Sequence, residues 1–434
     1  MSAPVDTLPN SDSFPKRVDV VVIGGGIAGV CTAWFLAKKG RSVCVLEKGR
    51  IAGEQSSRNW GYVRQQGRDE KEIPLARDSL RLWQQLQDGI GYDLGFRQTG
   101  VLYATCDHKK ADLWNGWAQA AKSYGVESRV LDAKQTQDLA SGCTVPWIGG
   151  LYTASDGRAE PSMAAPAIAR AAKDLGVFVH QNCAVRGMET TAGRVSSVFT
   201  ERGEIRTDAV VCAAGVWSSL FCKRHGLNLP QLSSCGSVMK TEAVDSVMEG
   251  AISSELFALR RRVDNSYTLA HSYRLTYFLE PALLRHFFRF LPMYMKERKN
   301  LKLRVNGSFF RKLCTKSHWA FDQASPFEAI RVLDPKPDLR ELHRGLEEVR
   351  KAYPSLANLK MDYAWAGIID ATPDSIPVNS QVNQLPGFYL ATGFSGHGFG
   401  LGPGAGQMMA DLVNGDKSAV DPRPFAYERL VGTP

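Results

Sequence analysis

The arrangement of apolar and polar positions is most regular near the start of the chain. Val20–Ile23 is an uninterrupted apolar run and residues 42–46 form a second one, each typical of a strand buried on both faces. Between them, residues 30–38 read as a helix, and Gly40 follows its end. The pattern predicts a strand, a helix and a second strand, which is the repeating unit of a parallel sheet.

Similar patterns continue along the chain but change character in the middle. Helical spacing of apolar residues predicts helices, and short apolar runs predict strands. The expected helices cover residues 72–86, 110–124, 164–175, 339–353 and 407–413, and the expected strands cover residues 96–104, 177–179, 194–199, 209–214 and 387–393. Between residues 230 and 365, apolar and polar residues alternate, which is typical of antiparallel strands; the clearest cases are 237–242, 256–262 and 267–271. We therefore expect two domains built on different sheets.

Composition sets limits on this picture. The 434 residues, 44% of them hydrophobic, suffice for more than one domain. Residues 1–16 are rich in Pro, Ser and Asp, so we expect a disordered tail and no signal peptide. No apolar run reaches the length of a membrane span. The nine cysteines are scattered without a Cys-x-x-Cys pair, which favours reduced thiols in a cytoplasmic protein over a disulfide framework or a metal site.

The net charge of +9 is concentrated in one segment. Residues 271–316 contain 11 Lys and Arg and two Glu, a net of +9, so the rest of the chain sums to zero and binding to nucleic acid is not expected. Within this segment, Leu and Phe side chains gather around Arg285 and Arg289, and Pro292 should kink or divide any helix. Two interpretations stay open: the apolar side chains close a pocket or pack on the sheet, or residues 281–304 contact an anionic membrane surface.

The first turn of the chain carries the chemistry of a dinucleotide site. Gly24, Gly26 and Gly29 have the spacing G-x-G-x-x-G between the first strand and its helix. Gly24 permits the tight turn, Gly26 lets backbone N–H groups approach a pyrophosphate, and Gly29 lets helix and strand pack closely. Glu47 ends the second strand, where its carboxylate can accept hydrogen bonds from ribose hydroxyls. Because strand, helix, second strand and acid are all present, the sequence predicts an adenine dinucleotide.

Four separated stretches resemble a single family. They read DVVVIGGGIAGV from residue 19, AVVCAAGVWS from 209, AWAGIIDATPDSIPVNS from 364 and FYLATGFSGHGFGLGPGAGQMMADLV from 388. Together they resemble the D-amino-acid oxidase superfamily of FAD-dependent oxidoreductases, in order and over nearly the whole chain. The segment EQSSRNWGYVRQQG, which starts at Glu54, is similar to bacterial L-amino-acid deaminases.

The resemblance implies an α/β (α+β) fold with two discontinuous domains. A Rossmann-like FAD-binding domain of the glutathione-reductase type is expected from residues 17–75, 145–229 and 366–434. An antiparallel-sheet substrate-binding domain is expected from residues 76–144 and 230–365, with the basic helical segment 271–316 inside it. The deaminases also carry an N-terminal membrane helix, which we do not expect in this chain.

The resemblance further assigns residues to a bound FAD. Some branches of the family attach the flavin through Cys or His; since no cysteine follows Cys314, we expect non-covalent FAD, with His397 as the remaining candidate for attachment. Ser56, Ser57 and Arg58 are expected to hold phosphate and ribityl oxygens, and the glycines after residue 393 to let the backbone approach the flavin. The full set of expected FAD contacts is Gly24, Gly26, Ile27, Ala28, Gly29, Glu47, Lys48, Gln55, Ser56, Ser57, Arg58, Gly61, Tyr62, Val63, Ala184, Val185, Ala214, Gly215, Trp217, Gly367, Gly393, Ser395, Gly396, His397, Gly398, Phe399 and Gly400.

An amino-acid substrate needs a partner for its carboxylate, and an arginine fork is the natural one. The stretch FALRRRV predicts a strand with three consecutive arginines, in which Arg260 and Arg262 share one face. A solvated edge strand is the alternative. We expect Arg260 to hold the carboxylate, with Arg262 next, while Tyr62, Gln65 and Trp365 contact the substrate or wall its pocket.

These assignments imply FAD-dependent oxidative deamination of an L-amino acid. Hydride transfer from Cα to flavin N5 would give an imine, which water converts to the 2-oxo acid and ammonia. Oxidation of a D-amino acid or an N-substituted glycine such as sarcosine is the alternative within enzymes, and a flavin-bearing subunit without turnover is the alternative outside them. The sequence indicates neither the electron acceptor, oxygen or a respiratory quinone, nor the oligomeric state.

Overall fold

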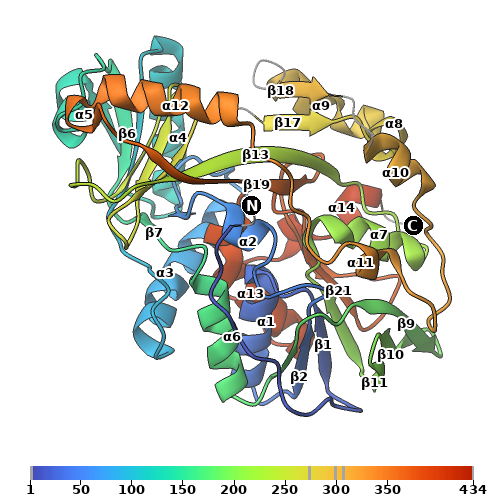
Figure 1. Ribbon diagram of the computed structural model, residues 1–434. Helices are drawn as coiled ribbons and strands as arrows, with labels where there is room; N and C mark the ends of the chain where they lie inside the picture. The colour runs from blue at the N-terminus through green and yellow to red at the C-terminus, as the bar shows by residue number, and fades with distance from the viewer. Residues whose placement is uncertain (1–2, 272–274, 298–300, 305–307, 433–434) are drawn as a thin grey trace.

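Two β-sheets organise the chain in the computed structural model, which describes residues 3–271, 275–297, 301–304 and 308–432. A mainly parallel sheet around β1 (Val20–Ile23) lies in the lower part of Figure 1. A larger, mainly antiparallel sheet lies above it, and its long strands β13 (Leu232–Thr241) and β19 (Met361–Ala371) cross the molecule between the two parts.

The parallel sheet has the order β20-β21-β12-β1-β2-β8. β1 pairs in parallel with β2 and with β12, and only the edge strand β20 runs antiparallel to its neighbour among the described strands of this sheet. Its other members are β2 (Val43–Leu46), β8 (Phe178–His180), β12 (Ala209–Cys212), β20 (Val378–Gln381) and β21 (Phe388–Thr392). All four residues of β1 and of β2 are buried, because both faces of this sheet are covered.

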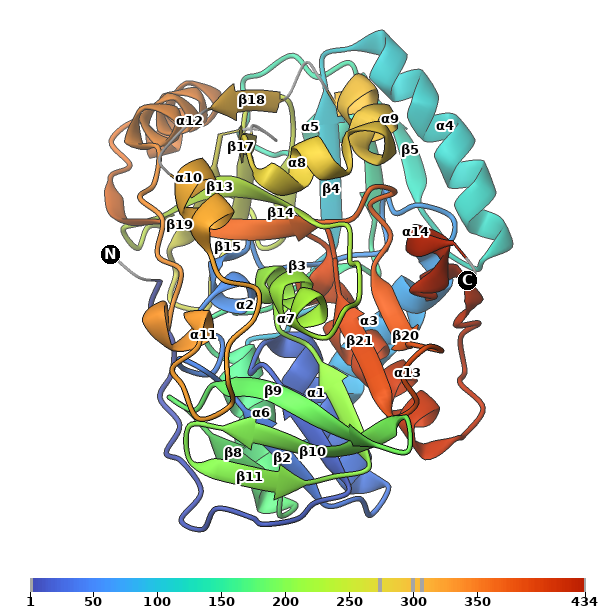
Figure 2. The same cartoon turned by 90° about the vertical axis from the view of Figure 1, so that its right-hand side faces the viewer.

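The two faces of β1 enter different cores. Val20 and Val22 pack with the helices on one face, whereas Val21 and Ile23 pack with a small antiparallel sheet and α7 on the other. The helices are α1 (Ile27–Lys38), α3 (Ile73–Gly89), α6 (Ala164–Asp174) and α13 (Gly398–Asn414). The opposite layer comprises β9 (Val185–Thr191), β10 (Arg194–Thr200), β11 (Gly203–Arg206) and α7 (Ser218–Arg224), which lie in front of the parallel strands in Figure 2.

The larger sheet has the order β18-β17-β13-β16-β15-β14-β4-β6-β5, and β19 pairs with β13 over nearly its whole length. Helix α12 (Leu339–Ala352) covers one face through Leu342, Leu346 and Val349. The remaining strands are β4 (Val101–Thr105), β5 (Arg129–Asp132), β6 (Gly149–Thr153), β14 (Ala251–Ser253), β15 (Ala258–Arg261), β16 (Tyr267–Ala270), β17 (Leu275–Phe278) and β18 (Leu301–Arg304).

The remaining elements are short or peripheral. They are α2 (Gln55–Arg58), α4 (His108–Ser123), α5 (Ala133–Leu139), α8 (Pro281–Arg285), α9 (Phe287–Glu297), α10 (Ser308–Cys314), α11 (Pro326–Ala329), α14 (Glu428–Val431), the paired strands β3 (Tyr62–Val63) and β7 (Gly157–Arg158), and the 3-10 turns η1 (Gly215–Trp217), η2 (Pro354–Leu356) and η3 (Arg423–Phe425).

Most long periodic segments are confirmed as helices or strands, and two expectations near the C-terminus are wrong. Residues 367–377 read as a turn in the sequence, but β19 continues to Ala371, because β13 pairs with it as far as Leu232. Helix α13 begins at Gly398 instead of residue 407. Gly402, Gly404 and Gly406 face other helices, where any side chain would collide: a Cβ on Gly402 would meet Ile27 and one on Gly406 would meet Cys31.

The N-terminal segment corrects the expectation of a disordered tail. Residues 3–16 pack against both parts of the molecule: Ala3 is buried with Val238 and Trp365 of the larger sheet, and Leu8 is buried in the core around α1. The backbone N–H of Asp6 donates to Ser162 O (3.0 Å) and that of Ser11 to Val179 O (2.9 Å). The segment has no periodic pattern because it docks through single apolar side chains and backbone groups. Residues 1 and 2 lie outside the described residues.

The expected domain boundaries also shift. Strand β6 belongs to the larger sheet, although residues 145–229 were expected in the FAD-binding domain. Helix α3 packs into the core around α1, although residues 76–144 were expected in the substrate domain. The chain therefore crosses between the two sheets at more places than composition reveals.

Candidate functional site

A cavity of about 370 Å³ lies between the two sheets. Its walls come from the β1–α1 turn, the loop after β2, the middle of β13, the end of β19 and residues 394–400. The first strand of the dinucleotide motif and the substrate sheet therefore face the same space.

The β1–α1 turn has the close packing that the glycine spacing predicts. Gly24 has φ +109°, a conformation that side chains rarely adopt, and a Cβ on Gly29 would stand 2.1 Å from Gly24 O. The backbone N–H of Ile27, at the first turn of α1, donates to Ser56 Oγ (2.8 Å). Gly24, Gly26, Ile27 and Ala28 line the cavity, so the positive end of α1 points toward it.

Glu47 stands at the tip of β2 on the cavity wall. Its two oxygens accept from the backbone N–H groups of Gly25 (2.8 Å) and Gly49 (2.7 Å). Burial raises the pKa of Glu47, and these N–H donors and Lys48 oppose the rise. The backbone thus fixes the carboxylate beside the first turn of α1.

Two positively charged side chains of the loop after β2 are paired with carboxylates of the protein itself. Lys48 Nζ pairs with Glu54 Oε1 (2.7 Å) and lies 4.4 Å from the centroid of the Trp217 ring. The buried Arg58 donates to Gly53 O, to Ala366 O (2.9 Å) and to Asp334 Oδ1 (2.8 Å). Arg58 therefore joins its loop to β19, whereas we expected it to hold phosphate.

Charged side chains from one loop meet the start of α13 at the cavity wall. His397 Nδ1 and Glu72 Oε1 lie 3.1 Å apart, and Arg64, Arg68 and His397 line the cavity. Burial and then Arg68 lower the pKa of His397, so its ring is neutral at pH 7. Burial and Arg64 lower the pKa of Arg68 to about 10, so it keeps its charge. Its Nη1 is buried without a hydrogen-bond partner among the described residues.

Asp370 fixes the loop that leads into α13. Its Oδ2 accepts from Gln231 Nε2 (2.7 Å) and from the backbone N–H of Gly393 (2.7 Å). Burial raises the pKa of Asp370, and these donors oppose the rise. The next residues have positive φ at Ser395 and Gly396, and residues 394–400 all reach the cavity wall.

Most expected FAD contacts line this cavity. They are Gly24, Gly26, Ile27, Ala28, Glu47, Lys48, Gln55, Ser56, Arg58, Tyr62, Val185, Ala214, Gly215, Trp217, Gly367, Ser395, Gly396, His397, Gly398, Phe399 and Gly400. The expected contacts that lie behind its wall are Gly29, Ser57, Gly61, Val63, Ala184 and Gly393. Gly29 and Gly393 serve close packing there, since a Cβ on Gly393 would meet Thr372.

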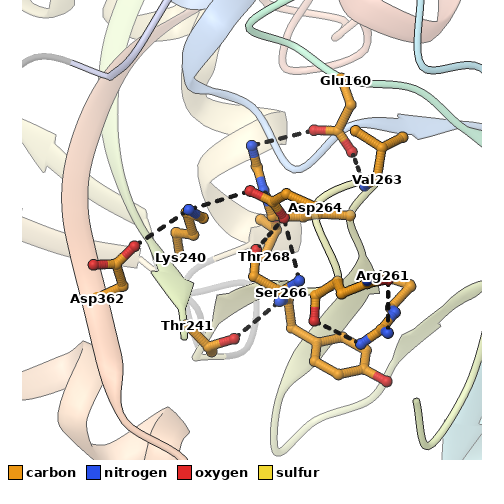
Figure 3. A network of polar contacts seen from close by, with 12 residues as sticks. Glu160, Lys240, Thr241, Arg261, Val263, Asp264, Ser266, Thr268 and Asp362 are labelled. Atoms are coloured by element: carbon orange, nitrogen blue, oxygen red, sulfur yellow. Dashed lines mark hydrogen bonds and ion pairs between the residues drawn. The ribbon is translucent and has the colours of Figure 1, made fainter. Parts of the chain in front are cut away.

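The arginine strand differs from expectation in its partners. Arg260 and Arg262 share one face of the strand and its turn, as alternation predicts, but both meet the buried Glu160 (2.7 and 3.2 Å). Figure 3 shows Glu160 beside Val263, whose backbone N–H donates to it. Burial alone would raise the pKa of Glu160, but the two guanidinium charges hold it below its ordinary value. Neither arginine lines the cavity, which corrects their assignment to the substrate carboxylate.

The same hairpin carries a second polar group. Lys240 lies between Asp264 (3.1 Å) and Asp362 (3.2 Å) (Figure 3). The backbone N–H of Tyr267 donates to Thr241 Oγ1. Arg261, on the opposite face, donates to Val244 O and Asn265 O. All three consecutive arginines therefore have partners within the protein.

Two further expected contacts lie behind the cavity wall. Gln65 donates through its backbone and side chain to the buried Asp156. Trp365 Nε1 donates to Arg58 O (3.2 Å), and its ring packs with Val238. Tyr62 does reach the cavity, and its hydroxyl donates to Ile252 O (2.9 Å).

Several cavity residues were not found from the sequence. They are Trp60, Arg68, His271, Asp338 and Glu341 on the wall, with Glu72 behind His397. The sequence did offer a signal for Arg68, because it lies in a long polar stretch next to a dinucleotide motif.

Comparison with known sequences decides the family. The sequence profile described as FAD dependent oxidoreductase (DAO) matches residues 19–412. The chain belongs to this family. The beta subunit of a sarcosine oxidase from an Arthrobacter species is 26% identical over 442 residues, which cover 98% of this chain and 96% of that one.

This FAD-dependent oxidoreductase also resembles solved structures over its full length. The L-amino acid deaminase of Proteus myxofaciens superposes with a TM-score of 0.95 at 29% identity, covering 99% of this chain and 97% of that one. The deaminase of Proteus vulgaris gives 0.93 at 29% identity, covering 98% and 100%. The chain is an enzyme of the flavin amino-acid oxidoreductase class.

The residues around the cavity fit the FAD on which the family depends. A row of glycines leaves room where side chains would stand: Cβ atoms on Gly26 and Gly215 would approach Ser56 Oγ and Gln55. The end of α1 would offer N–H groups to the pyrophosphate, and Glu47 would offer a carboxylate to a ribose. Within the described part of the chain, no group of His, Cys, Asp and Glu could hold a metal ion.

Proposed function

We propose that this protein removes the α-amino group of an L-amino acid by FAD-dependent oxidation. Bound FAD would supply the acceptor for the hydride that leaves Cα. The observation that carries the proposal is that one cavity joins the dinucleotide turn to a wall bearing Arg64 and Arg68. The likeness to two L-amino acid deaminases, at TM-scores of 0.95 and 0.93, supports the L-enantiomer.

In this proposal the two ends of the cavity bind different parts of FAD. Gly24, Gly26 and the first turn of α1 hold the pyrophosphate, Glu47 holds the ribose, and residues 395–400 hold the flavin end. Ser56 prepares this site by accepting from Ile27 N–H, and Asp370 prepares it by holding Gly393. These contacts orient the reacting groups, which is the protein's share of the catalysis.

We assign the substrate carboxylate to Arg68 together with Arg64. Among the cations on the described cavity wall, Lys48 and Arg58 are already paired with Glu54 and Asp334. Arg68 instead retains a buried Nη1 without a partner among the described residues, which costs free energy until an acceptor arrives. A carboxylate is the acceptor that a guanidinium fork matches best.

Oxidation of an N-substituted glycine is the second candidate. The observation that favours it is the sarcosine oxidase beta subunit, which matches nearly the whole chain. The two reactions use the same cofactor and the same carboxylate contact. They differ in the groups carried by nitrogen and by Cα.

Anaerobic mixing of the purified yellow protein with a panel of substrates tests the proposal. We expect L-amino acids to bleach the flavin absorbance, and D-amino acids and N-methylglycine to leave it unchanged. Bleaching by N-methylglycine alone would favour the second candidate, and bleaching by none of the panel would overturn both. We also expect acid to release intact FAD, since the binding is non-covalent; flavin that stays on the denatured chain would point to attachment.

A further inference from the structure

A buried carboxylate joins the start of α3 to the start of α13. Glu72 immediately precedes α3, His397 immediately precedes α13, and the two helices pack side by side (Figures 1 and 2). His397 Nδ1 lies 3.1 Å from Glu72 Oε1. The Glu72 side chain is fully buried, whereas 26% of the His397 side chain is exposed. Since His397 lines the cavity, Glu72 supports its ring from behind the cavity wall.

This contact decides which nitrogen of His397 carries the proton. Burial alone would raise the pKa of Glu72, but His397, Arg68 and Arg64 hold it below its ordinary value, so its carboxylate is ionised at pH 7. An ionised carboxylate only accepts hydrogen bonds, so the neutral ring donates through Nδ1. The lone pair is then on Nε2, which has no hydrogen-bond partner among the described residues. A histidine oriented in this way by a carboxylate is suited to act as a general base.

Arg68 binds the other end of a substrate at the same wall. Its side chain is almost completely buried, and its Nη1 has no partner among the described residues. After burial, the charge of Arg68 is the largest cause of the lowered pKa of His397, so the two side chains are near neighbours. In an α-amino acid a single carbon joins the ammonium to the carboxylate. A carboxylate held by Arg68 therefore leaves the ammonium close to His397.

We propose that His397 is the proton acceptor for the substrate ammonium, with Glu72 as its positioning residue. The inference rests on the proposed function, in which Arg68 binds the substrate carboxylate. An ammonium group has no lone pair, so it loses a proton before a double bond to Cα can form. The N–H bond breaks, the proton goes to Nε2, and the lone pair left on nitrogen forms the C=N bond as the hydride leaves Cα for FAD. The imidazolium, paired with Glu72, returns its proton to water after the product leaves.

Substrate binding itself strengthens this base. The charged side chains that act most strongly on His397 are Arg68, Glu72 and Arg64. In the free protein the two arginines oppose a second proton on the ring, and Glu72 favours it. A substrate carboxylate at Arg68 adds negative charge beside the ring. The proton affinity of His397 therefore rises when the ammonium arrives.

The pH dependence of flavin bleaching tests this role. The FAD-loaded full chain is mixed anaerobically with the L-amino acid of the panel that bleaches the wild type fastest. We expect His397→Gln to slow bleaching at pH 7 by about 100-fold or more, and to regain rate at higher pH, where the substrate amine is already free. The wild type should lose rate only as the pH falls below the ordinary histidine range. Glu72→Gln should move this loss to lower pH, because its carboxylate no longer raises the pKa of His397.

Binding of benzoate supplies a readout that does not depend on turnover. Benzoate has a carboxylate and no ammonium, so its Kd, measured from the flavin spectrum, should be the same in His397→Gln and in the wild type. Arg68→Gln should weaken it. His343→Gln, at an exposed position of α12, is the matched control and should match the wild type in both measurements.

Two outcomes would overturn the inference while the proposed function stands. One is a wild-type pH profile and rate in His397→Gln. The other is a loss of benzoate and FAD affinity in His397→Gln as large as its loss of rate, which would give the ring a structural role. A wild type that no L-amino acid bleaches would overturn the proposed function and this inference together.

Discussion

At the scale of single residues, several charged side chains are buried and paired with one another. Arg260 is fully buried and meets Glu160, which in turn also meets Arg262. Removing one member of such a group leaves the others charged, buried and uncompensated. The roles of these residues are therefore separable by experiment, because stability and substrate affinity report on different partners.

Arg260→Ala should destabilise the protein without a selective effect on substrate affinity. We expect a loss of about 3–5 kcal/mol in the free energy of unfolding, since Glu160 loses its closest partner. Denaturant unfolding measures it. Arg97→Ala breaks the exposed pair with Asp93 and serves as the control, with an expected loss of about 0–1 kcal/mol. Normal stability with a raised KM would return Arg260 to the carboxylate role.

Arg68→Gln should weaken use of the substrate while the protein keeps its flavin. Loss of a charge-assisted carboxylate contact should lower kcat/KM by roughly 10- to 100-fold, mainly through KM. Arg68→Lys should recover part of this loss, because it restores the charge but not the fork. Arg81→Gln on the exposed face of α3 is the matched control. An unchanged KM in Arg68→Gln would move the carboxylate to another cation.

At the scale of elements, the crossing of α1, α3 and α13 brings the dinucleotide turn and the flavin loop together. The helices approach closely because α13 presents glycines: a Cβ on Gly404 would stand 2.9 Å from Ser79 Cβ, and one on Gly406 would stand 2.4 Å from Cys31 Cβ. The same glycines appear in the sequence as a flavin-binding loop. One stretch therefore serves two purposes, since residues 394–400 line the cavity and the later glycines pack against other helices.

Gly406→Ala should lower stability by overpacking this crossing. We expect about 1–3 kcal/mol, because the new methyl group meets Cys31 and the backbone beside it. Gly116→Ala is the control, since nothing lies within 4 Å of a Cβ at that helical position. Thermal unfolding of both variants measures the difference. Loss of flavin from Gly406→Ala at an unchanged melting temperature would show that the position serves the cofactor directly.

At the scale of the whole molecule, folding buries histidines in their neutral form. Burial is the first cause of a lowered pKa in each of His180, His225, His286 and His397. Such groups take up protons more readily in the unfolded chain. Their combined effect is a protein whose stability decreases as the solution becomes acidic.

The pKa of His225 defines the pH range over which this loss of stability is expected. Its pKa falls to about 4 in the folded protein from the ordinary 6.5. Between these values the unfolded state binds more protons, so stability is present above pH 6.5 and is lost as the pH falls toward 4. His225→Gln should flatten the slope of unfolding free energy against pH in this window, measured by urea unfolding from pH 8 to 4. Identical slopes in the two proteins would show that His225 does not titrate between these limits.

The sequence by itself determined the elements whose physics is local. The turn from Gly24 to Gly29 and the acid Glu47 lie within one strand–helix–strand unit, so their spacing alone identifies the site. The hairpin of β15 and β16 and the amphipathic helix α12 follow equally from alternation and helical spacing. These features need no information about distant residues.

Tertiary structure decided everything that depends on a distant partner. Glu160 contacts Arg260 although the two are 100 residues apart in the sequence. No pattern around FALRRRV indicates that a buried carboxylate lies beside these arginines. Likewise, the Leu and Phe residues of 281–295 have the same spacing whether they face a sheet or water. Only the folded chain shows that Phe290 points inward and Phe288 outward. The physical reason is that hydrophobicity drives burial without choosing the partner, whereas charge and packing are settled by the residues that folding brings together.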